Sequence, residues 1–166
     1  LNTAAKAPFA CFVKYYSSYV LCASPERFLK KEGARVFSQP MKGTIEKSNI
    51  ESENRALQLQ LQQSEKERAE NIMIVDLVRN DLAKSCKTGS VKVDELCGVY
   101  AFETINQMIS TISGTAKNEV GITDVIKNAF PMGSMTGAPK IEVMQAIDAI
   151  EDFQRGIFSG TVGYIT

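Results

Sequence analysis

SEKERAENIMIVDLVRNDL, residues 64–82, is the one segment of this chain in which an amphipathic helix carries carboxylates on the same side as its apolar residues. Counted at about 100° per residue, Glu67 and Glu70 lie within roughly 80° of one another and of an apolar stripe. The stripe runs through Ile74 and Val78 and must face the protein interior. Both acids therefore face inward, and we interpret them as candidate metal ligands.

Two local interactions offer a different account of the same acids. Ser64 followed by Glu67 is an S-x-x-E capping box, in which the carboxylate accepts a hydrogen bond from the backbone N–H of Ser64. Glu70 follows Lys66 by four residues, a spacing that favours an ion pair worth about 0.2–0.5 kcal/mol. The helix by itself leaves the metal site and these structural roles open.

Composition favours one soluble globular domain. The chain has 166 residues, 44% of them hydrophobic and 23% charged, which is enough apolar material for one sizeable core. Lysine plus arginine equals aspartate plus glutamate at 19 each, so no net charge attracts nucleic acid or an anionic membrane. We therefore expect neither nucleic acid nor membrane as a partner, and an acidic ligand must be bound by local groups.

The remaining composition indicates a reducing, cytoplasmic setting. The apolar runs of the sequence, such as residues 72–75, are too short to span a bilayer, and residues 1–10 lack the layout of a signal peptide. The four cysteines form no C-x-x-C pair, which favours free thiols over disulfides or zinc ligands. Histidine is absent, which excludes Ser-His and Cys-His nucleophile pairs and histidine-ligated zinc.

The pattern along the chain predicts an α+β fold. We expect strands at 9–15, 19–24, 27–30, 35–39, 90–93, 99–102 and 107–114, and helices at 48–63, 64–82, 123–130 and 141–150. Residues 40–44 interrupt the strand pattern, and strands are expected to resume at Gly156 and Val162. Because Thr166 falls in what reads as a strand, we expect residues 1–166 to be part of a catalytic domain whose N-terminal region and C-terminal end are absent.

Two polar residues near turns are candidates for chemistry. Lys42 lies between Pro40 and Gly43, where a constrained turn can present a neutral amine that attacks carbon. Glu26 follows a predicted strand, and a buried carboxyl at this position can act as an acid. The alternatives are an ordinary surface lysine and a glutamate paired with a neighbouring cation.

The segment GSMTGAPK, residues 133–140, has the composition of a phosphate-binding loop but fails the Walker spacing. Pro139 suits the first turn of the following helix, so the amides of Gly137 and Ala138 are expected beside a positive helix end. That arrangement suits a carboxylate ligand. A plain helix start, in which the glycines serve the turn, is the alternative.

Six segments together resemble the chorismate-utilising enzymes, in the order in which that family carries them. They are SPERF (24–28), PMKGT (40–44), KERAEN (66–71), DLVRND (76–81), TGAPK (136–140) and RGIFSG (155–160). The resemblance covers nearly the whole chain. It implies a two-sheet β-sandwich flanked by helices and a Mg²⁺-dependent transformation of chorismate, with Glu70 as a direct metal ligand and Glu67 reaching the ion through water.

The same resemblance implies roles for other residues. Glu26 matches the general acid that protonates the leaving C4 hydroxyl of chorismate. Lys42 resembles the nucleophile of aminodeoxychorismate synthases, which attacks C2 before ammonia from a glutamine amidotransferase subunit adds at C4; this reaction leads to para-aminobenzoate and folate. The implied substrate-binding residues are Gly43, Thr44, Gln107, Gly137, Ala138, Lys140 and Phe158.

Three positions depart from the family pattern. Asn71 and Gln107 stand where histidine is frequent, and Phe158 stands where a substrate-contacting tyrosine is common. The amides keep hydrogen-bonding capacity, but Phe158 cannot donate to a carboxylate. The alternatives within the family are an anthranilate synthase and an isochorismate or salicylate synthase. The three departures also leave open a non-catalytic assembly domain.

Overall fold

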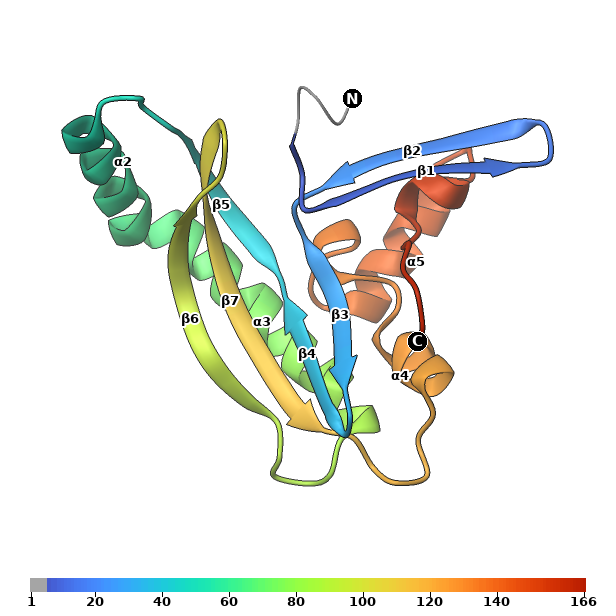
Figure 1. Cartoon of the computed structure of the whole chain (residues 1–166). Helices are drawn as coiled ribbons and strands as arrows, with labels where there is room; N and C mark the ends of the chain where they lie inside the picture. Colours follow the sequence, from blue (N-terminus) through green and yellow to red (C-terminus); the bar gives the residue numbers. More distant parts are fainter. Residues whose placement is uncertain (1–5) are drawn as a thin grey trace.

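The computed structural model describes residues 6–166 as two antiparallel sheets and four α-helices (Figure 1). The strands are β1 (Phe9–Tyr15), β2 (Ser18–Ser24), β3 (Arg27–Glu32), β4 (Arg35–Gln39), β5 (Met41–Glu46), β6 (Lys92–Ala101) and β7 (Ile105–Thr115). The helices are α2 (Glu51–Gln63), α3 (Glu65–Ser85), α4 (Ile122–Ala129) and α5 (Lys140–Ile150), with 3₁₀ turns η1 (Gly133–Met135) and η2 (Gly156–Ser159). The predicted α+β class is confirmed.

Strand β7 is the centre of the larger sheet. β4 and β5 pair one after the other along one edge of β7, β6 pairs along the opposite edge, and β3 pairs with β4. Pro40 separates β4 from β5 because it has no backbone N–H to donate to the ladder. Its carbonyl still accepts from the N–H of Ser110 at 3.2 Å, which keeps the two short strands on the same edge.

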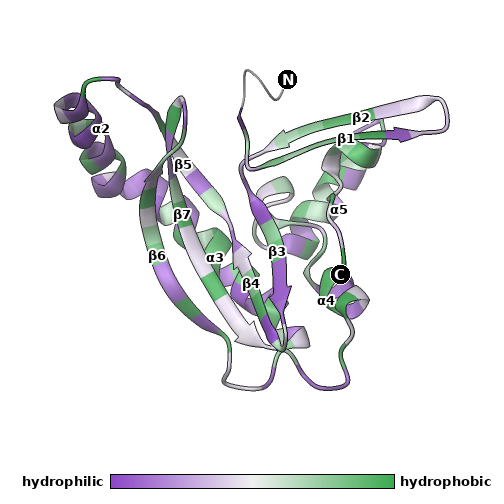
Figure 2. Cartoon of the chain, in the orientation of Figure 1, coloured by the Kyte–Doolittle hydropathy of each residue, from purple (hydrophilic) through white to green (hydrophobic). Residues whose placement is uncertain are grey.

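Helix α3 lies against one face of this sheet and buries its apolar side there (Figure 1). Val75 and Leu82 pack with Ile112 of β7 and Val36 of β4, and all four side chains are at most 3% exposed. Helix α4 adds Val125 to the same core. By contrast α2 is largely hydrophilic along its length (Figure 2). The position of α3 is therefore set by the burial of apolar side chains between Ile74 and Leu82.

Three sequence expectations are wrong. Residues 41–46 are strand β5 although Pro40 and Gly43 are turn signals, because the strand pairs with β7 on both sides of a bulge. The strand expected at Gly156 is a 3₁₀ turn, and residues 160–166, where a strand was expected at Val162, have no regular structure. The two strands predicted within 90–102 are one bulged strand, β6.

The structure also bears on the cysteines and on the length and apolar character of the helices. The cysteines are free thiols, as expected. Among residues 6–166, no helix combines the length and the apolar character that a membrane span requires.

Candidate active site

An open cleft of about 560 Å³ brings together most of the residues singled out in the sequence. It is lined by Ser24, Pro25, Glu26, Met41, Lys42, Gly43, Thr44, Glu67, Glu70, Gln107, Ser134 and Met135. Five parts of the chain supply these residues, namely the β2–β3 connection, β5, β7, the first turns of α3, and η1. A volume of this size is in the range that small-molecule ligands occupy.

The carboxylates of α3 line the cleft and take no part in a reciprocal capping box. The Ser64 hydroxyl accepts from the N–H of Glu67 at 3.4 Å, but the N–H of Ser64 donates to the carbonyl of Leu61 at 3.2 Å. Within residues 6–166, neither Glu67 nor Glu70 forms an ion pair, including the pair with Lys66 that the spacing suggested. Two half-buried acids without a cation therefore face the same cleft.

Gly43 allows β5 to approach α3 at this point. Its φ of +99° is a conformation that residues with a Cβ rarely adopt. A Cβ added there would lie 3.2 Å from Glu67 Cβ and 3.3 Å from Glu67 Oε2. The absence of a side chain at Gly43 thus permits both the backbone conformation of the β5 bulge and the close contact with the Glu67 side chain.

Lys42 is presented to the cleft by the same bulge. Met41 is opposite Ile109 and Thr44 is opposite Gln107, so Lys42 and Gly43 together oppose a single residue of β7. A bulge re-aims the side chain it carries. Lys42 is half-buried and forms no ion pair within the described residues.

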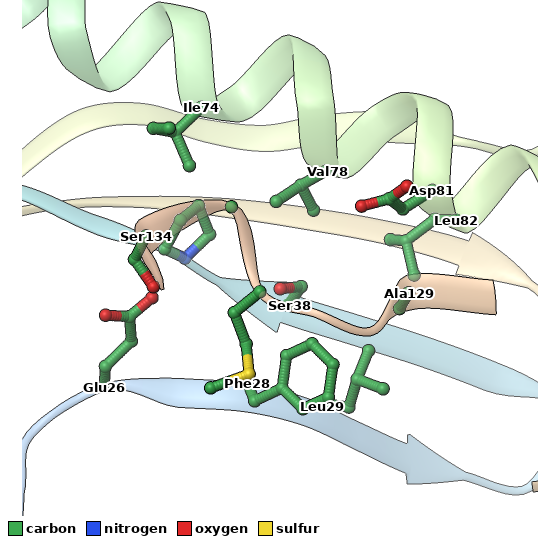
Figure 3. Close-up of a pocket in the computed structure, with 13 residues that line it drawn as sticks. Glu26, Phe28, Leu29, Ser38, Ile74, Val78, Asp81, Leu82, Ala129 and Ser134 are labelled. Atoms are coloured by element: carbon green, nitrogen blue, oxygen red, sulfur yellow. The ribbon is translucent and has the colours of Figure 1, made fainter. Parts of the chain in front are cut away.

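Glu26 lies at the floor of the cleft, where its N–H donates to the Ser24 hydroxyl at 3.2 Å. Burial raises the pKa of its carboxyl, while hydrogen bonding from the Ser134 hydroxyl and from the backbone at Met41, and the charge of Lys42, lower it. Figure 3 shows the carboxyl facing Ser134 at one end of a cavity of about 20 Å³ that extends toward Asp81. A carboxyl with a raised pKa is suited to donate a proton.

A polar pair completes the side of the cleft formed by the sheet. The Thr44 hydroxyl donates to Oε1 of Gln107 at 3.0 Å across β5 and β7. This bond leaves the amide NH₂ of Gln107 as the donor available to a ligand.

Four of the residues predicted to bind substrate do not line the cleft. Lys140 is 11% exposed and its Nζ donates to Asp81, to the carbonyl of Ala129 at 3.0 Å and to that of Pro131 at 2.6 Å. Phe158 lies on η2 with 85% of its surface exposed. Gly137 and Ala138 do precede α5, but neither lines the cleft. A buried carboxylate competes for the lysine, which sequence spacing cannot reveal.

Ser134 and Met135 are cleft residues that sequence reasoning missed. The segment that carries them approaches α3 closely because a Cβ on Gly133 would lie 2.7 Å from Leu77 Cδ2. Arg155 donates to the Met135 carbonyl at 2.9 Å and pairs with Glu151. The glycine in GSM and the helix at 64–82 were both visible in the sequence, but the contact between them was not.

The donor set fits a hard divalent cation only in part. Glu67 and Glu70 supply the oxygen ligands that Mg²⁺ prefers, and that ion commonly binds one or two carboxylates together with water and substrate. Within residues 6–166, no three acidic, cysteine or histidine side chains converge on one point. The two carboxylates of α3 are thus suited to a shared site, completed by other groups.

Comparison with known proteins identifies the family. A family model described as chorismate binding enzyme matches residues 1–166. The chain belongs to the chorismate-binding enzyme family. It is 46% identical over 163 residues to a protein of Oryza sativa named probable aminodeoxychorismate synthase, chloroplastic, covering 96% of this chain. It is 40% identical over its whole length to aminodeoxychorismate synthase component 1 of Salmonella typhimurium.

Solved structures of the family agree with the fold. Anthranilate synthase component I of Streptococcus pneumoniae superposes with a TM-score of 0.87 at 30% identity, covering 98% of this chain and 35% of the other. The chain spans 18% of the Oryza sativa relative and 37% of the Salmonella typhimurium relative. The family and its fold are therefore common to proteins considerably longer than 166 residues.

We predict that Glu26→Gln makes the protein progressively more stable than the unsubstituted protein as pH rises. Because the folded-state pKa of Glu26 is raised, its contribution to stability is fully present below the unfolded-state pKa and is lost as pH rises through the folded-state value. Urea unfolding between about pH 4 and pH 8 measures the difference in free energy.

Asp94→Asn is the matched control for this measurement. Hydrogen bonding from the Ser113 hydroxyl foremost, then from Lys92, with the charges of Lys92 and Arg35, lowers the pKa of Asp94. Its contribution is therefore present above the unfolded-state pKa and is lost as pH falls through the folded-state value. The variant should lose stability relative to the unsubstituted protein as pH rises only at the acidic end of the range, with no further change toward pH 8. A flat or falling difference for Glu26→Gln contradicts the prediction.

Proposed function

We propose that the protein catalyses the amination of chorismate at C4, giving 4-amino-4-deoxychorismate, a reaction of para-aminobenzoate and folate synthesis. The observation that carries this proposal is that Lys42 lies on a bulge in the same cleft as Glu26, Glu67 and Glu70. A nucleophile, an acid and two oxygen ligands are the groups this reaction needs. The names of the relatives in Oryza sativa and Salmonella typhimurium support it further.

The proposed reaction takes place in two displacements. The unprotonated amine of Lys42 attacks C2, the two conjugated ring double bonds shift, and the C4–O bond breaks as Glu26 gives its proton to the leaving hydroxyl, which departs as water. Ammonia then attacks C4, both double bonds return to their original positions, and the C2–N bond to Lys42 breaks. The proton that ammonia loses balances the one that Glu26 gave. The sum is chorismate plus ammonia giving aminodeoxychorismate plus water.

Burial supports the role proposed for Glu26. It raises the pKa of the carboxyl and so favours the neutral acid, although hydrogen bonding from Ser134 and from the backbone at Met41, and the charge of Lys42, act in the opposite direction. The neutral acid is the form of Glu26 from which the first displacement starts.

We further propose that Mg²⁺ is the cofactor, with Glu70 as direct ligand and Glu67 acting through water. When bound, the ion supplies positive charge for the ring carboxylate of chorismate. The Thr44–Gln107 pair and Gly43 also line the cleft and are the groups proposed to orient the ring. Ammonia is proposed to come from a glutamine amidotransferase subunit, in keeping with the words component 1 in the name of the Salmonella typhimurium relative.

An anthranilate synthase is the second candidate. The match to the Streptococcus pneumoniae anthranilate synthase component I favours it. Lys42 favours the first candidate, because amination at C2 with release of pyruvate requires no amine nucleophile from the protein.

The product of the reaction distinguishes the two candidates. We expect the complete enzyme, given chorismate, Mg²⁺ and an ammonium salt, to form aminodeoxychorismate, identified by liquid chromatography and mass spectrometry. Fluorescent anthranilate formed without any added lyase would overturn the proposal. An assembly domain without catalysis would bind neither chorismate nor Mg²⁺ in isothermal titration calorimetry.

Lys42→Ala tests the covalent step. Trapping the enzyme with chorismate before ammonia is added should give an adduct on Lys42, located by peptide mass spectrometry, and none in the variant. Lys66→Ala is the control, because Lys66 is exposed and does not line the cleft. An adduct on any other residue removes Lys42 from the role of nucleophile.

Glu70→Gln tests the metal site. Losing the charged oxygen should raise the Mg²⁺ concentration for half-maximal activity by about 10- to 100-fold and weaken Mg²⁺ binding in calorimetry by a similar factor. Asp76→Asn on the same helix is the matched control, since Asp76 is exposed and pairs with Arg79 at 2.8 Å. Equal effects of the two substitutions would argue against a metal ligand at Glu70.

A further inference from the structure

Two β-bulges face each other across β7. On one edge Lys42 and Gly43 of β5 together oppose Met108, and on the other edge Leu96 and Cys97 of β6 together oppose Ser110. A bulge removes backbone groups from the ladder, and buried backbone groups left without partners are costly. Met108, Ser110 and Cys97 are all at most 2% exposed. The partners of these groups must come from side chains.

Asn71 of α3 supplies the hydrogen-bond partners at the bulge that carries Lys42. Its Nδ2 donates to the carbonyl of Lys42 at 3.2 Å and to the carbonyl of Met108 at 3.3 Å. Its Oδ1 accepts from the Ser110 hydroxyl and from the Cys97 thiol, the latter at 3.8 Å. Both amide protons and both lone pairs are thus used, by groups on three different strands.

The second bulge is joined to the same group through Ser110. The hydroxyl of Ser110 accepts from the N–H of Cys97 at 2.9 Å and donates to Oδ1 of Asn71. Cys97 has a φ of +56°, which turns its N–H from the ladder toward this hydroxyl. A continuous series of hydrogen bonds therefore leads from β6 through Ser110 and Asn71 to the Lys42 carbonyl.

We propose, on the basis of the function proposed above, that Asn71 is a positioning residue that fixes the reactive amine of Lys42 relative to the carboxylates of α3. Asn71 is 1% exposed and does not line the cleft, so it acts through the Lys42 main chain. It directly follows Glu70 in the helix. One turn of α3 thereby holds both the candidate metal ligand and the peptide from which the nucleophile projects.

The amide group is what this role requires. An aspartate at the same place has the same shape but no N–H, so its carboxyl would face the carbonyl oxygens of Lys42 and Met108 without a donor for either. The bond that holds the Lys42 peptide would be lost, and the bulge would be free to shift. Displacing a reacting group by about 1 Å can lower the rate about 100-fold.

The test compares two buried asparagines in the complete enzyme. Asn71→Asp should lower kcat for aminodeoxychorismate formation by about 100-fold, with the KM for chorismate changed by less than about threefold. The rate of Lys42 adduct formation, measured by rapid quench and mass spectrometry, should fall by the same factor. Thermal unfolding of each variant is recorded beside the kinetics.

Asn106→Asp is the matched control. Asn106 is fully buried, donates to the Glu46 carbonyl at 3.0 Å and to Asn54 at 2.8 Å, and accepts from Gln58 at 3.0 Å. Its loss should lower the unfolding temperature to a similar degree, because it too leaves carbonyl and amide groups unpaired. It makes no bond to Lys42, so kcat should stay within about threefold of the unsubstituted enzyme.

Ser110→Ala provides a second variant if Asn71→Asp does not fold. It removes one bond to Asn71 without adding charge, and kcat should fall about three- to tenfold with KM unchanged. A fall in kcat for Asn71→Asp no larger than for Asn106→Asp, or a loss confined to KM, would overturn the positioning role. If the unsubstituted enzyme forms neither aminodeoxychorismate nor a Lys42 adduct, it is the proposed function that fails.

Discussion

Val75 and Leu82 of α3 are buried against Val36 and Ile112 of the sheet, and this packing orients every polar group that the helix carries. Apolar burial holds the C-terminal half of α3, because each such side chain contributes about 1.5–3 kcal/mol. The N-terminal turns extend past the core to the edge of β5, where Glu67 and Glu70 meet the cleft. The carboxylates are thus held rigidly by a part of the helix that touches no ligand.

The acidic residues of α3 differ in whether they form ion pairs. Near the C-terminal end, Asp81 is buried and neutralised by Lys140 and Lys84. Breaking such a buried pair costs about 3–5 kcal/mol, so these charges stabilise the fold and do not bind a ligand. At the N-terminal end the acids have no cation within the described residues and remain open to a ligand. The same segment of sequence therefore holds a structural ion pair and a candidate metal site.

The bulge in β5 determines how Lys42 is placed, just as the packed core determines the placement of Glu67 and Glu70. A continuous strand would alternate side chains along the edge of β7, whereas Pro40 and the bulge at Gly43 interrupt that alternation where Lys42 projects. The interruption is tolerated because Asn71 and Ser110 supply partners for the backbone groups that the bulges release. The backbone that presents Lys42 to the cleft is thus held by side chains that do not line the cleft.

The amino-acid sequence by itself determined the α+β class, most of the helices and strands, and the inward position of Glu67 and Glu70, because these follow from local periodicity. Tertiary structure alone decided that residues 41–46 form a strand, since pairing with β7 outweighs the local turn signals. It also decided that Lys140 binds Asp81, that Ser134 meets Glu26, and that Asn71 is buried beneath Lys42. Each of these is a contact between segments far apart in the chain, and spacing along a sequence carries no information about which buried group will lie opposite another.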